Sequence, residues 1–334
     1  MLSAVIERTV GPQAGEIDRT GAYPRDSVQA LGEAGLLGIL SAPEVGGTGE
    51  PLAAAAHVIE QLAGRCGSTA MVVLMHYAAV GVIEAHGPRD VRRAIARGEH
   101  VSSLAFSEAG SRSHFWAPES TATAGEGDTV TLDARKSWVT SAGQADSYVW
   151  SSLPVHGKAP RTESSCLPTR GDDGAGLDIA LGTALPYFAV LNAAFSLGVM
   201  EALVAEAAAH LSRTRLQHLG QTLAQQPVTR AAFAQLRIRT DTTRAFLQDT
   251  LTALATGRED ATLRVLQVKA VAAEAATEVS DGVLRLCGGA AFRKELGVER
   301  RFRDSLAARV MAPTTEALHD FVGRVSLGLP LFDS

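Results

Sequence analysis

The stretch that decides the fold lies near the C-terminus and reads Arg303-Asp304-Ser305-Leu306-Ala307-Ala308-Arg309-Val310-Met311-Ala312-Pro313-Thr314-Thr315-Glu316. It follows long runs with helical spacing of apolar residues, and the pattern predicts a further helix over about 315–327. The side chain of Ala312 can neither take nor give a proton. Acid–base chemistry at this stretch therefore needs a group from another residue.

The composition indicates a globular chain with a large core. It has 334 residues, of which 46% are hydrophobic and 20% charged, and a formal net charge of -5. This charge supplies no sequence-wide positive field for a phosphate backbone, which argues against nucleic-acid binding. The three cysteines lie far apart without zinc-ligand spacing, as expected of a reducing cytoplasm. No stretch is expected to span a membrane, and the apolar run 184–209 is interpreted as a buried helix.

Three regions with different local patterns follow one another along the chain. Residues 1–100 have the pattern of an N-terminal helical domain, with helices expected at 26–33, 52–63, 69–85 and 90–97. Residues 101–180 are predicted to form a shortened β-domain, with strands near 102–106, 129–134 and 147–150 and a loop from 151 to 178. Residues 181–334 are predicted to form a C-terminal four-helix bundle, with helices at 186–211, 228–257, 261–286 and 315–327.

Four further motifs lie in a fixed order along the chain. They are Leu104-Ala105-Phe106-Ser107-Glu108-Ala109-Gly110-Ser111, Lys136-Ser137-Trp138-Val139-Thr140-Ser141, Arg213-Thr214-Arg215-Leu216-Gln217-His218-Leu219-Gly220 and Leu286-Cys287-Gly288-Gly289-Ala290-Ala291-Phe292. With the C-terminal stretch, they resemble motifs of the acyl-CoA dehydrogenase superfamily in order and spacing. The resemblance implies a mainly α fold with a small β-domain, formed by an N-terminal helical domain, a partial β-barrel and a C-terminal four-helix bundle.

The resemblance also implies a flavin site and its residues. The cofactor would be FAD, bound weakly or lost if the β-domain is incomplete. The first two motifs imply contacts to the flavin ring, with an aromatic cover from Trp138, and the later ones imply contacts to the dinucleotide or its pyrophosphate, partly from a neighbouring subunit. The implied cofactor-binding residues are Phe106, Ser107, Ser111, Trp138, Thr140, Arg213, Arg215, Gly288, Gly289 and Thr314.

The sequence departs from the family pattern at the base that removes the substrate's α-proton. The resemblance implies a carboxylate at the position of Ala312, or in other members near Phe188, and neither residue can take a proton. His114, which follows the first motif, is the candidate catalytic residue. Other carboxylates could substitute, namely Glu201, Glu206, Asp241 and Glu316, although an ordinary structural role explains each of them as well.

Three functions stay open on these grounds. The first is a flavin-dependent dehydrogenase acting on an acyl thioester, either acyl-CoA or an acyl carrier. The second is a monooxygenase on the same scaffold that uses reduced flavin and needs no α-proton base. The third is a base-less, non-catalytic or repurposed subunit. In each case the resemblance implies a homodimer or tetramer, or pairing with a homologous subunit.

Overall fold

The computed structural model describes residues 1–110, 114, 117–126, 129–153, 155–156 and 175–332. The N-terminal part is helical: α1 (Leu2–Val5), the π-helical segment η1 (Ile6–Val10), α2 (Gly11–Thr20) and α3 (Arg25–Glu33) precede a short turn η2 (Pro43–Val45). Helices α4 (Leu52–Ala63), α5 (Gly67–His86) and α6 (Arg89–Ala96) follow. The four predicted helices of this region agree with α3 to α6 to within two residues at each end.

The β-region between the helical parts contains two small sheets. Strand β1 (Ser102–Ala105) pairs parallel with β4 (Ser147–Trp150). In the second sheet, β2 (Thr121–Ala124) lies between an antiparallel partner, β3 (Val130–Asp133), and a parallel one, β5 (Val155–His156). The sequence analysis missed β2, because its Thr-Ala-Thr-Ala pattern carries only small side chains and gives a weak alternation signal.

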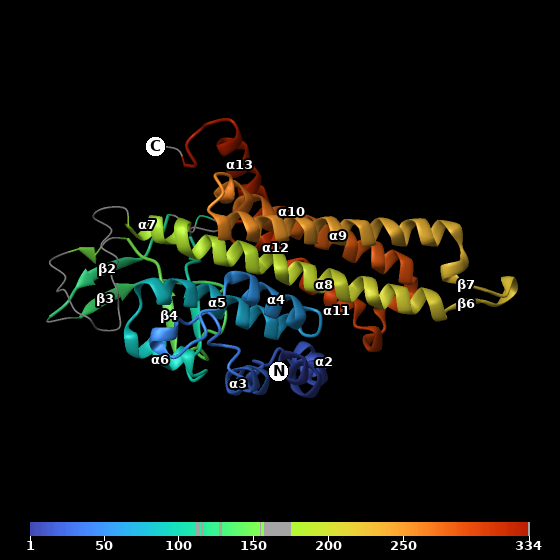
Figure 1. The fold of residues 1–334 in the computed structure, drawn as a ribbon, viewed down its shortest axis with the longest axis horizontal. Helices are drawn as coiled ribbons and strands as arrows, with labels where there is room; N and C mark the ends of the chain where they lie inside the picture. The colour runs from blue at the N-terminus through green and yellow to red at the C-terminus, as the bar shows by residue number, and fades with distance from the viewer. Residues whose placement is uncertain (111–113, 115–116, 127–128, 154, 157–174, 333–334) are drawn as a thin grey trace.

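The C-terminal part is built around three long antiparallel helices (Figure 1). These are α8 (Leu185–Arg213), α9 (Pro227–Thr256) and α10 (Ala261–Cys287). Between α8 and α9 lie a small hairpin, β6 (Arg215–Leu216) and β7 (Gln221–Thr222), and the 3-10 turns η5 (Gln217–Leu219) and η6 (Leu223–Gln225). After α10 come η7 (Gly288–Phe292), η8 (Lys294–Leu296), α11 (Val298–Ser305), α12 (Ala307–Val310) and α13 (Thr315–Ser326), which packs on α10 and projects from the bundle.

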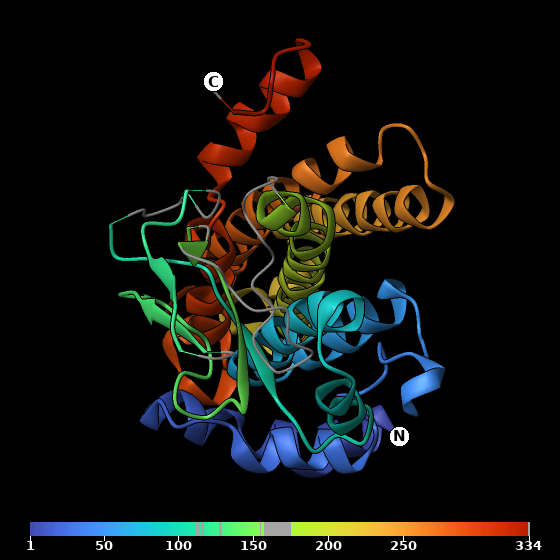
Figure 2. The same ribbon diagram turned by 90° about the vertical axis from the view of Figure 1, so that its left-hand side faces the viewer.

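Helix α8 begins earlier than the sequence analysis predicted. It is continuous with α7 (Ala175–Ile179) and the π-helical segment η4 (Ala180–Ala184). The last four residues of the expected loop 151–178 are therefore helical, and the loop also contains the short strand β5. Much of the rest of it lies outside the described residues. π-helical insertions are rare and often occur at functional sites. Here η4 lies where α8 meets the β-region (Figures 1 and 2).

The core lies where α8 is covered by α4 and α5 on one side and by α9 and α10 on the other. Close approach is possible because Gly198 on α8 faces the α4 backbone, where an added Cβ would lie 2.1 Å from the Glu60 carbonyl oxygen. Figure 2 shows the N-terminal helices below this bundle and the strands beside it. The end of the bundle near α7 thus borders both the strands and α5.

Among the described residues, two helices have the length and apolar composition of a membrane-spanning helix, which the sequence analysis did not assign to any stretch. They are Gly67–His86 and Gly176–Arg213, and 78% and 83% of their apolar windows are buried inside the protein. The second helix contains the apolar run 184–209, which the sequence analysis interpreted as a buried helix. Such burial is typical of core helices in a large helical protein.

Candidate active site

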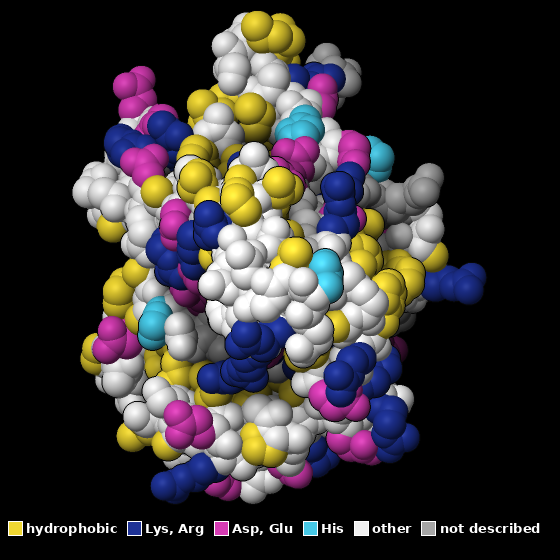
Figure 3. Space-filling view, turned by 90° about the vertical axis from the view of Figure 1, so that its right-hand side faces the viewer, with side chains coloured by type: hydrophobic (Ala, Val, Ile, Leu, Met, Phe, Trp, Pro, Cys, Tyr) yellow, Lys and Arg dark blue, Asp and Glu magenta, His cyan; other side chains and the backbone are white. Residues whose placement is uncertain are grey.

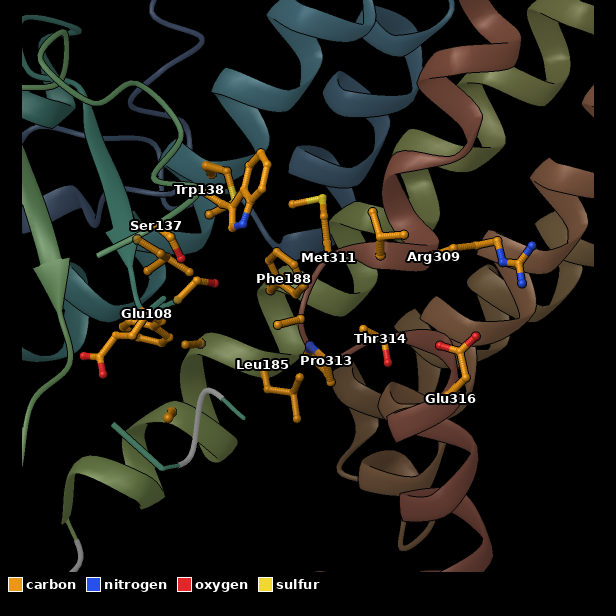
Figure 4. A pocket seen from close by; sticks show the side chains of 18 of the residues that line it. Glu108, Ser137, Trp138, Leu185, Phe188, Arg309, Met311, Pro313, Thr314 and Glu316 are labelled. Carbon is orange, nitrogen blue, oxygen red and sulfur yellow. The ribbon is translucent and has the colours of Figure 1, made fainter. Parts of the chain in front are cut away.

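A cavity of about 1010 Å³ lies between the β-region and the adjacent end of the bundle. Its volume is at the upper end of the range for small-molecule sites. One wall comes from the β-region and the other from α8 and the segment that joins α12 to α13 (Figure 4). The labelled lining residues are Glu108, Ser137, Trp138, Leu185, Phe188, Arg309, Met311, Pro313, Thr314 and Glu316.

Trp138 combines high exposure with a backbone conformation that is rare for a bulky residue. Its side chain is 93% exposed although it lines the cavity, and its backbone φ is 56°. A bulky residue in the left-handed region costs on the order of 1 kcal/mol or more, and such strain concentrates at ligand sites. An exposed indole at a cavity wall gains free energy when a flat ligand stacks on it. The indole of Trp138 thus offers the cavity an exposed aromatic surface.

The β-side wall is fixed by a buried ion pair. Lys136 Nζ donates to Glu108 Oε1 at 2.5 Å and to the Ser151 carbonyl at 2.6 Å, and both charged side chains are at most 4% exposed. Glu108 also accepts from the Ser120 hydroxyl at 2.5 Å. Burial raises the pKa of Glu108, but the hydrogen bonds from Lys136 and Ser120 outweigh it and hold that pKa below its usual value. Glu108 is thus an ionised structural group rather than a free base.

The helical wall presents no carboxylate at either position where the resemblance implies a base. Ala312 and Phe188 both line the cavity, and Phe188 is buried. Thr314 also lines it, and its Oγ1 accepts the Ala317 N–H at 3.4 Å as the N-cap of α13. The two positions at which the sequence lacks a carboxylate therefore both line the cavity.

The alternative carboxylates separate into two groups. Glu201 and Asp241 belong to a network in which Arg237 pairs with both, and the hydrogen bond from Arg237 lowers the pKa of Glu201 to about 2. Glu206 lies 3.9 Å from Arg301. None of these three lines the cavity. Glu316 does line it, in the first turn of α13, and is exposed.

Four predicted cofactor-binding residues meet at the cavity. Phe106, Ser107 and Trp138 come from the β-side, and Thr314 comes from the opposite wall. Thr140 lies in the turn after Trp138, is partly buried and does not line the cavity. Ser111 lies outside the described residues. His114 is exposed and is not among the lining residues, so its catalytic role stays a prediction.

The remaining predicted residues lie near the other end of the bundle. Arg213 is the last residue of α8, whereas Leu185, its first residue, lines the cavity. At the rise of an α-helix these two residues are about 40 Å apart. Arg215 follows in β6, where its Nη2 donates to the Gly220 carbonyl at 2.8 Å. Figure 3 shows that lysine and arginine side chains occur in several groups on this face, among acidic ones.

Gly288 and Gly289 follow the C-terminal end of α10, in η7. Helix α10 runs antiparallel to α9 and in the same direction as α8, so its C-terminal end lies toward the hairpin (Figure 1). Gly288 has a φ of 56°, a backbone conformation that glycine adopts without strain. One copy of the chain therefore does not bring these glycines or the two arginines to its own cavity.

Sequence reasoning missed two contributions to the site. It did not pair Glu108 with Lys136, because contacts across 28 residues of irregular chain leave no periodic signal. It also passed over Lys269, which is 0% exposed in α10. The sequence does indicate that Lys269 is buried, because it lies four residues after Val265 and seven before Ala276 on a helix face that is otherwise apolar.

The residues that line the cavity fit a flavin ring. The cavity is large enough for a planar ring system with part of a substrate, and the strained, exposed indole of Trp138 offers it a stacking surface. Hydroxyl side chains of Ser107, Ser137 and Thr314 add polar groups on both walls. The cavity thus offers both an aromatic surface for a flat ring and hydroxyl groups for the polar atoms at its edge.

Comparisons with known proteins agree with this architecture. Residues 1–98 match the acyl-CoA dehydrogenase N-terminal domain, and residues 174–327 match the acyl-CoA dehydrogenase C-terminal domain. The chain is 23% identical to the short-chain specific acyl-CoA dehydrogenase of Clostridium acetobutylicum, across 95% of this chain and 93% of that protein.

Solved structures show the same fold. Butyryl-CoA dehydrogenase from Megasphaera elsdenii superimposes with a TM-score of 0.87 at 18% identity, covering 98% of this chain and 96% of its own. KijD3, in complex with FMN and dTDP-3-amino-2,3,6-trideoxy-4-keto-3-methyl-D-glucose, has a TM-score of 0.80 at 21% identity, covering 98% and 92%. With both terminal domains matched in order along most of its length, this chain belongs to the acyl-CoA dehydrogenase family.

Proposed function

We propose that the protein is a flavin-dependent oxidoreductase that acts on an acyl thioester by dehydrogenase-type chemistry. The observation that carries this proposal is the strained, 93% exposed Trp138, which faces a cavity whose opposite wall carries Thr314. A bound flavin would supply a hydride acceptor. The family membership and the acyl-CoA dehydrogenases among its relatives support the substrate class.

The chain's own residues would bind and orient the reactants. Trp138 would stack on the flavin ring, and Phe106 and Ser107 would contact its edge from the end of β1. Thr314 would contact the ring from the helical wall, while Thr140 would contribute from the turn that carries Trp138. Apolar residues such as Leu185 and Phe188 would exclude water from the acyl chain.

The α-proton needs an acceptor, and the described cavity offers two carboxylates. Glu108 is held by Lys136 and cannot change protonation without breaking that pair. Glu316 is exposed, and hydrogen bonds from its own backbone amide and the Thr314 hydroxyl hold its pKa below the usual value. Glu316 is thus ionised at neutral pH, and we propose it as the acceptor, although a low pKa makes it a weak base.

FAD, if it is the form bound, would require a second copy of the chain. Arg213 lies about 40 Å from the start of α8, too far for one cofactor molecule to touch both ends within one chain. A neighbouring copy in a homodimer or tetramer would bring Arg213 or Arg215 to the pyrophosphate and Gly288 and Gly289 to the dinucleotide.

We also propose a cytoplasmic location, since Cys66 and Cys287 are free, buried thiols.

A second candidate function is monooxygenation with reduced flavin supplied by a separate reductase. The observation in its favour is Ala312, because this reaction needs no α-proton base and the cavity lacks a carboxylate at both positions that the family pattern implies. The fold similarity to KijD3, solved with FMN, is compatible with this alternative. The two functions differ in what the flavin reacts with first.

Anaerobic mixing of the flavin-loaded protein with acyl thioesters separates these functions. Acyl-CoA and an acyl-carrier thioester are tested in parallel, and the absorbance of the oxidised flavin is followed. The dehydrogenase proposal expects bleaching without any reductase, and slower bleaching in Glu316→Gln. Absence of bleaching with all thioesters, together with oxygen uptake that requires an added reductase, would overturn it in favour of the monooxygenase.

A further inference from the structure

Lys269 is a buried cation that the proposed chemistry does not use. It lies in the middle of α10 and is 0% exposed, with apolar residues before and after it on the same helix. Its Nζ also lies 5.9 Å from the ring centroid of Phe188, a residue that lines the cavity. Burying an ammonium group is costly unless its three N–H groups find acceptors.

Three backbone carbonyls meet this requirement. Lys269 Nζ donates to the carbonyl oxygens of Ala308 at 2.7 Å, Met311 at 3.0 Å and Pro313 at 2.8 Å. The number of acceptors therefore equals the number of N–H donors on a protonated lysine. Among residues with described positions, no carboxylate forms a salt bridge with Nζ, so the three carbonyl dipoles are the groups that compensate the charge at hydrogen-bond distance.

All three carbonyls belong to one short part of the chain, residues 308–314, which we call the wall segment. Met311, Ala312, Pro313 and Thr314 of this segment line the cavity. Residues 308–310 are the last residues of α12, and residues 311–314 join α12 to α13 outside any helix or strand. The path of the backbone past Ala312 is therefore set by tertiary contacts. Among these contacts are the three hydrogen bonds from Lys269, whose acceptors lie within residues 308–313.

The charge on Lys269 is sensitive to its surroundings. Burial lowers the pKa of the amine to about 7, and the carboxylate of Glu316 opposes this effect. Phe188, from α8, contributes an uncharged ring. A neutral amine keeps two N–H donors and turns a lone pair toward the third carbonyl, so the arrangement with three bonds belongs to the protonated form.

We propose that Lys269 is a positioning residue that holds the wall segment and thereby fixes Ala312 and Thr314 opposite Trp138. It would act through the backbone rather than by touching a ligand. The part of this inference that concerns substrate and flavin rests on the proposed function. The part that concerns the wall segment stands on the three hydrogen bonds and can be tested without any ligand.

The test is hydrogen–deuterium exchange of the protein in the variant Lys269→Met, which keeps most of the side-chain volume and removes the donors. Loss of charged hydrogen bonds is expected to raise amide exchange in peptides covering 307–317 by about tenfold or more. Peptides from α9 should keep their wild-type exchange. Lys294→Met is the matched control, because it removes an exposed lysine in η8 and should leave the wall segment unchanged.

A second variant and a kinetic readout guard against loss of the fold. Lys269→Gln retains an amide with two N–H donors and should raise wall-segment exchange less than Lys269→Met. In flavin-loaded protein, both variants should lower the rate of flavin reduction by substrate more than they change KM, because the reacting groups are misplaced rather than absent.

Two exchange results would overturn the inference. Unchanged exchange in the wall segment of both variants would show that Lys269 does not hold it. A rise spread evenly over the whole chain would show a general structural role instead. Neither result depends on flavin, so a colourless protein with loosened 307–317 peptides would contradict the proposed function while leaving the role of Lys269 intact.

Discussion

The two walls of the cavity are each organised around a buried lysine, but the two lysines are compensated in different ways. Lys136 on the β-side pairs with the carboxylate of Glu108, whereas Lys269 on the helical side bonds three backbone carbonyls. An ion pair fixes two side chains to each other, while the carbonyl cluster fixes the course of a backbone segment. The β wall is therefore held by two opposite charges. The helical wall is held by the three hydrogen bonds that Lys269 donates when its amine is protonated.

The largest effect is expected from breaking the ion pair of the β wall. Lys136→Met leaves Glu108 buried without its cation, which should lower the free energy of unfolding by about 3–5 kcal/mol. Denaturant unfolding measures this loss. The double variant Lys136→Met/Glu108→Gln removes both charges and should recover part of it; a double variant as unstable as the single one would show that the pair is not what fixes this wall.

A carboxylate placed on the helical wall should restore the base that the family pattern implies. Ala312→Glu is expected to speed flavin bleaching by an acyl thioester about a hundredfold, the lower range for a positioned general base. Stopped-flow absorbance measures the rate, and Ala312→Gln is the isosteric control. Equal rates in the two variants would mean that position 312 does not face the reacting carbon.

The pH dependence of stability tests the state of the Lys269 amine. Lys269 has a pKa of about 7 in the folded protein against an ordinary value of 10.5. Between these values the unfolded chain binds a proton that the folded chain lacks, so this group should make stability rise with pH by up to about 1.4 kcal/mol per unit. Below about pH 7 both states are protonated, and the slope from Lys269 should vanish.

The measurement is the difference in unfolding free energy between wild type and Lys269→Met from pH 6 to pH 10, because other titrating groups cancel in it. Above about pH 7, the unfolding free energy of wild type should increase relative to that of the variant. A difference that stays flat over this range would show that the ammonium of Lys269 keeps an ordinary pKa.

Removing the backbone strain at Trp138 should have a smaller effect, which raises stability and lowers flavin affinity. Trp138→Gly relieves the left-handed backbone and loses little burial, so the flavin-free protein should gain about 1 kcal/mol. The same variant should bind flavin more weakly, since the stacking surface is gone. Thermal unfolding and flavin titration give the two numbers; weaker binding without the gain in stability would locate the strain elsewhere.

The smallest effect is expected at Thr140, which lies beside the cavity rather than on it. Thr140→Ala removes one hydroxyl and should weaken flavin retention by about threefold, as for the loss of a single neutral hydrogen bond. Equilibrium dialysis against flavin measures the change, with Thr140→Ser as the control that keeps the hydroxyl. Identical retention in all three proteins would remove Thr140 from the site.

The sequence predicted the helical part well, because α4, α8, α9 and α10 carry long periodic apolar faces. It was weaker where side chains are small or pairings are distant, as in β2. For the site, motif resemblance singled out Trp138 and Thr314, which the structure places on opposite walls of the cavity. It did not reveal the bonds of Lys269, since a backbone carbonyl has no sequence signature and its partner is known only once the chain is folded.

The most direct test of the central claim is a titration of the flavin-free protein with FAD and with FMN, monitored by flavin fluorescence, in wild type and in Trp138→Ala. The account predicts saturable quenching with one flavin per chain in wild type and a clearly weaker affinity in the variant. Absence of saturable binding by either flavin, or equal affinity in the two proteins, would contradict a flavin seated against Trp138.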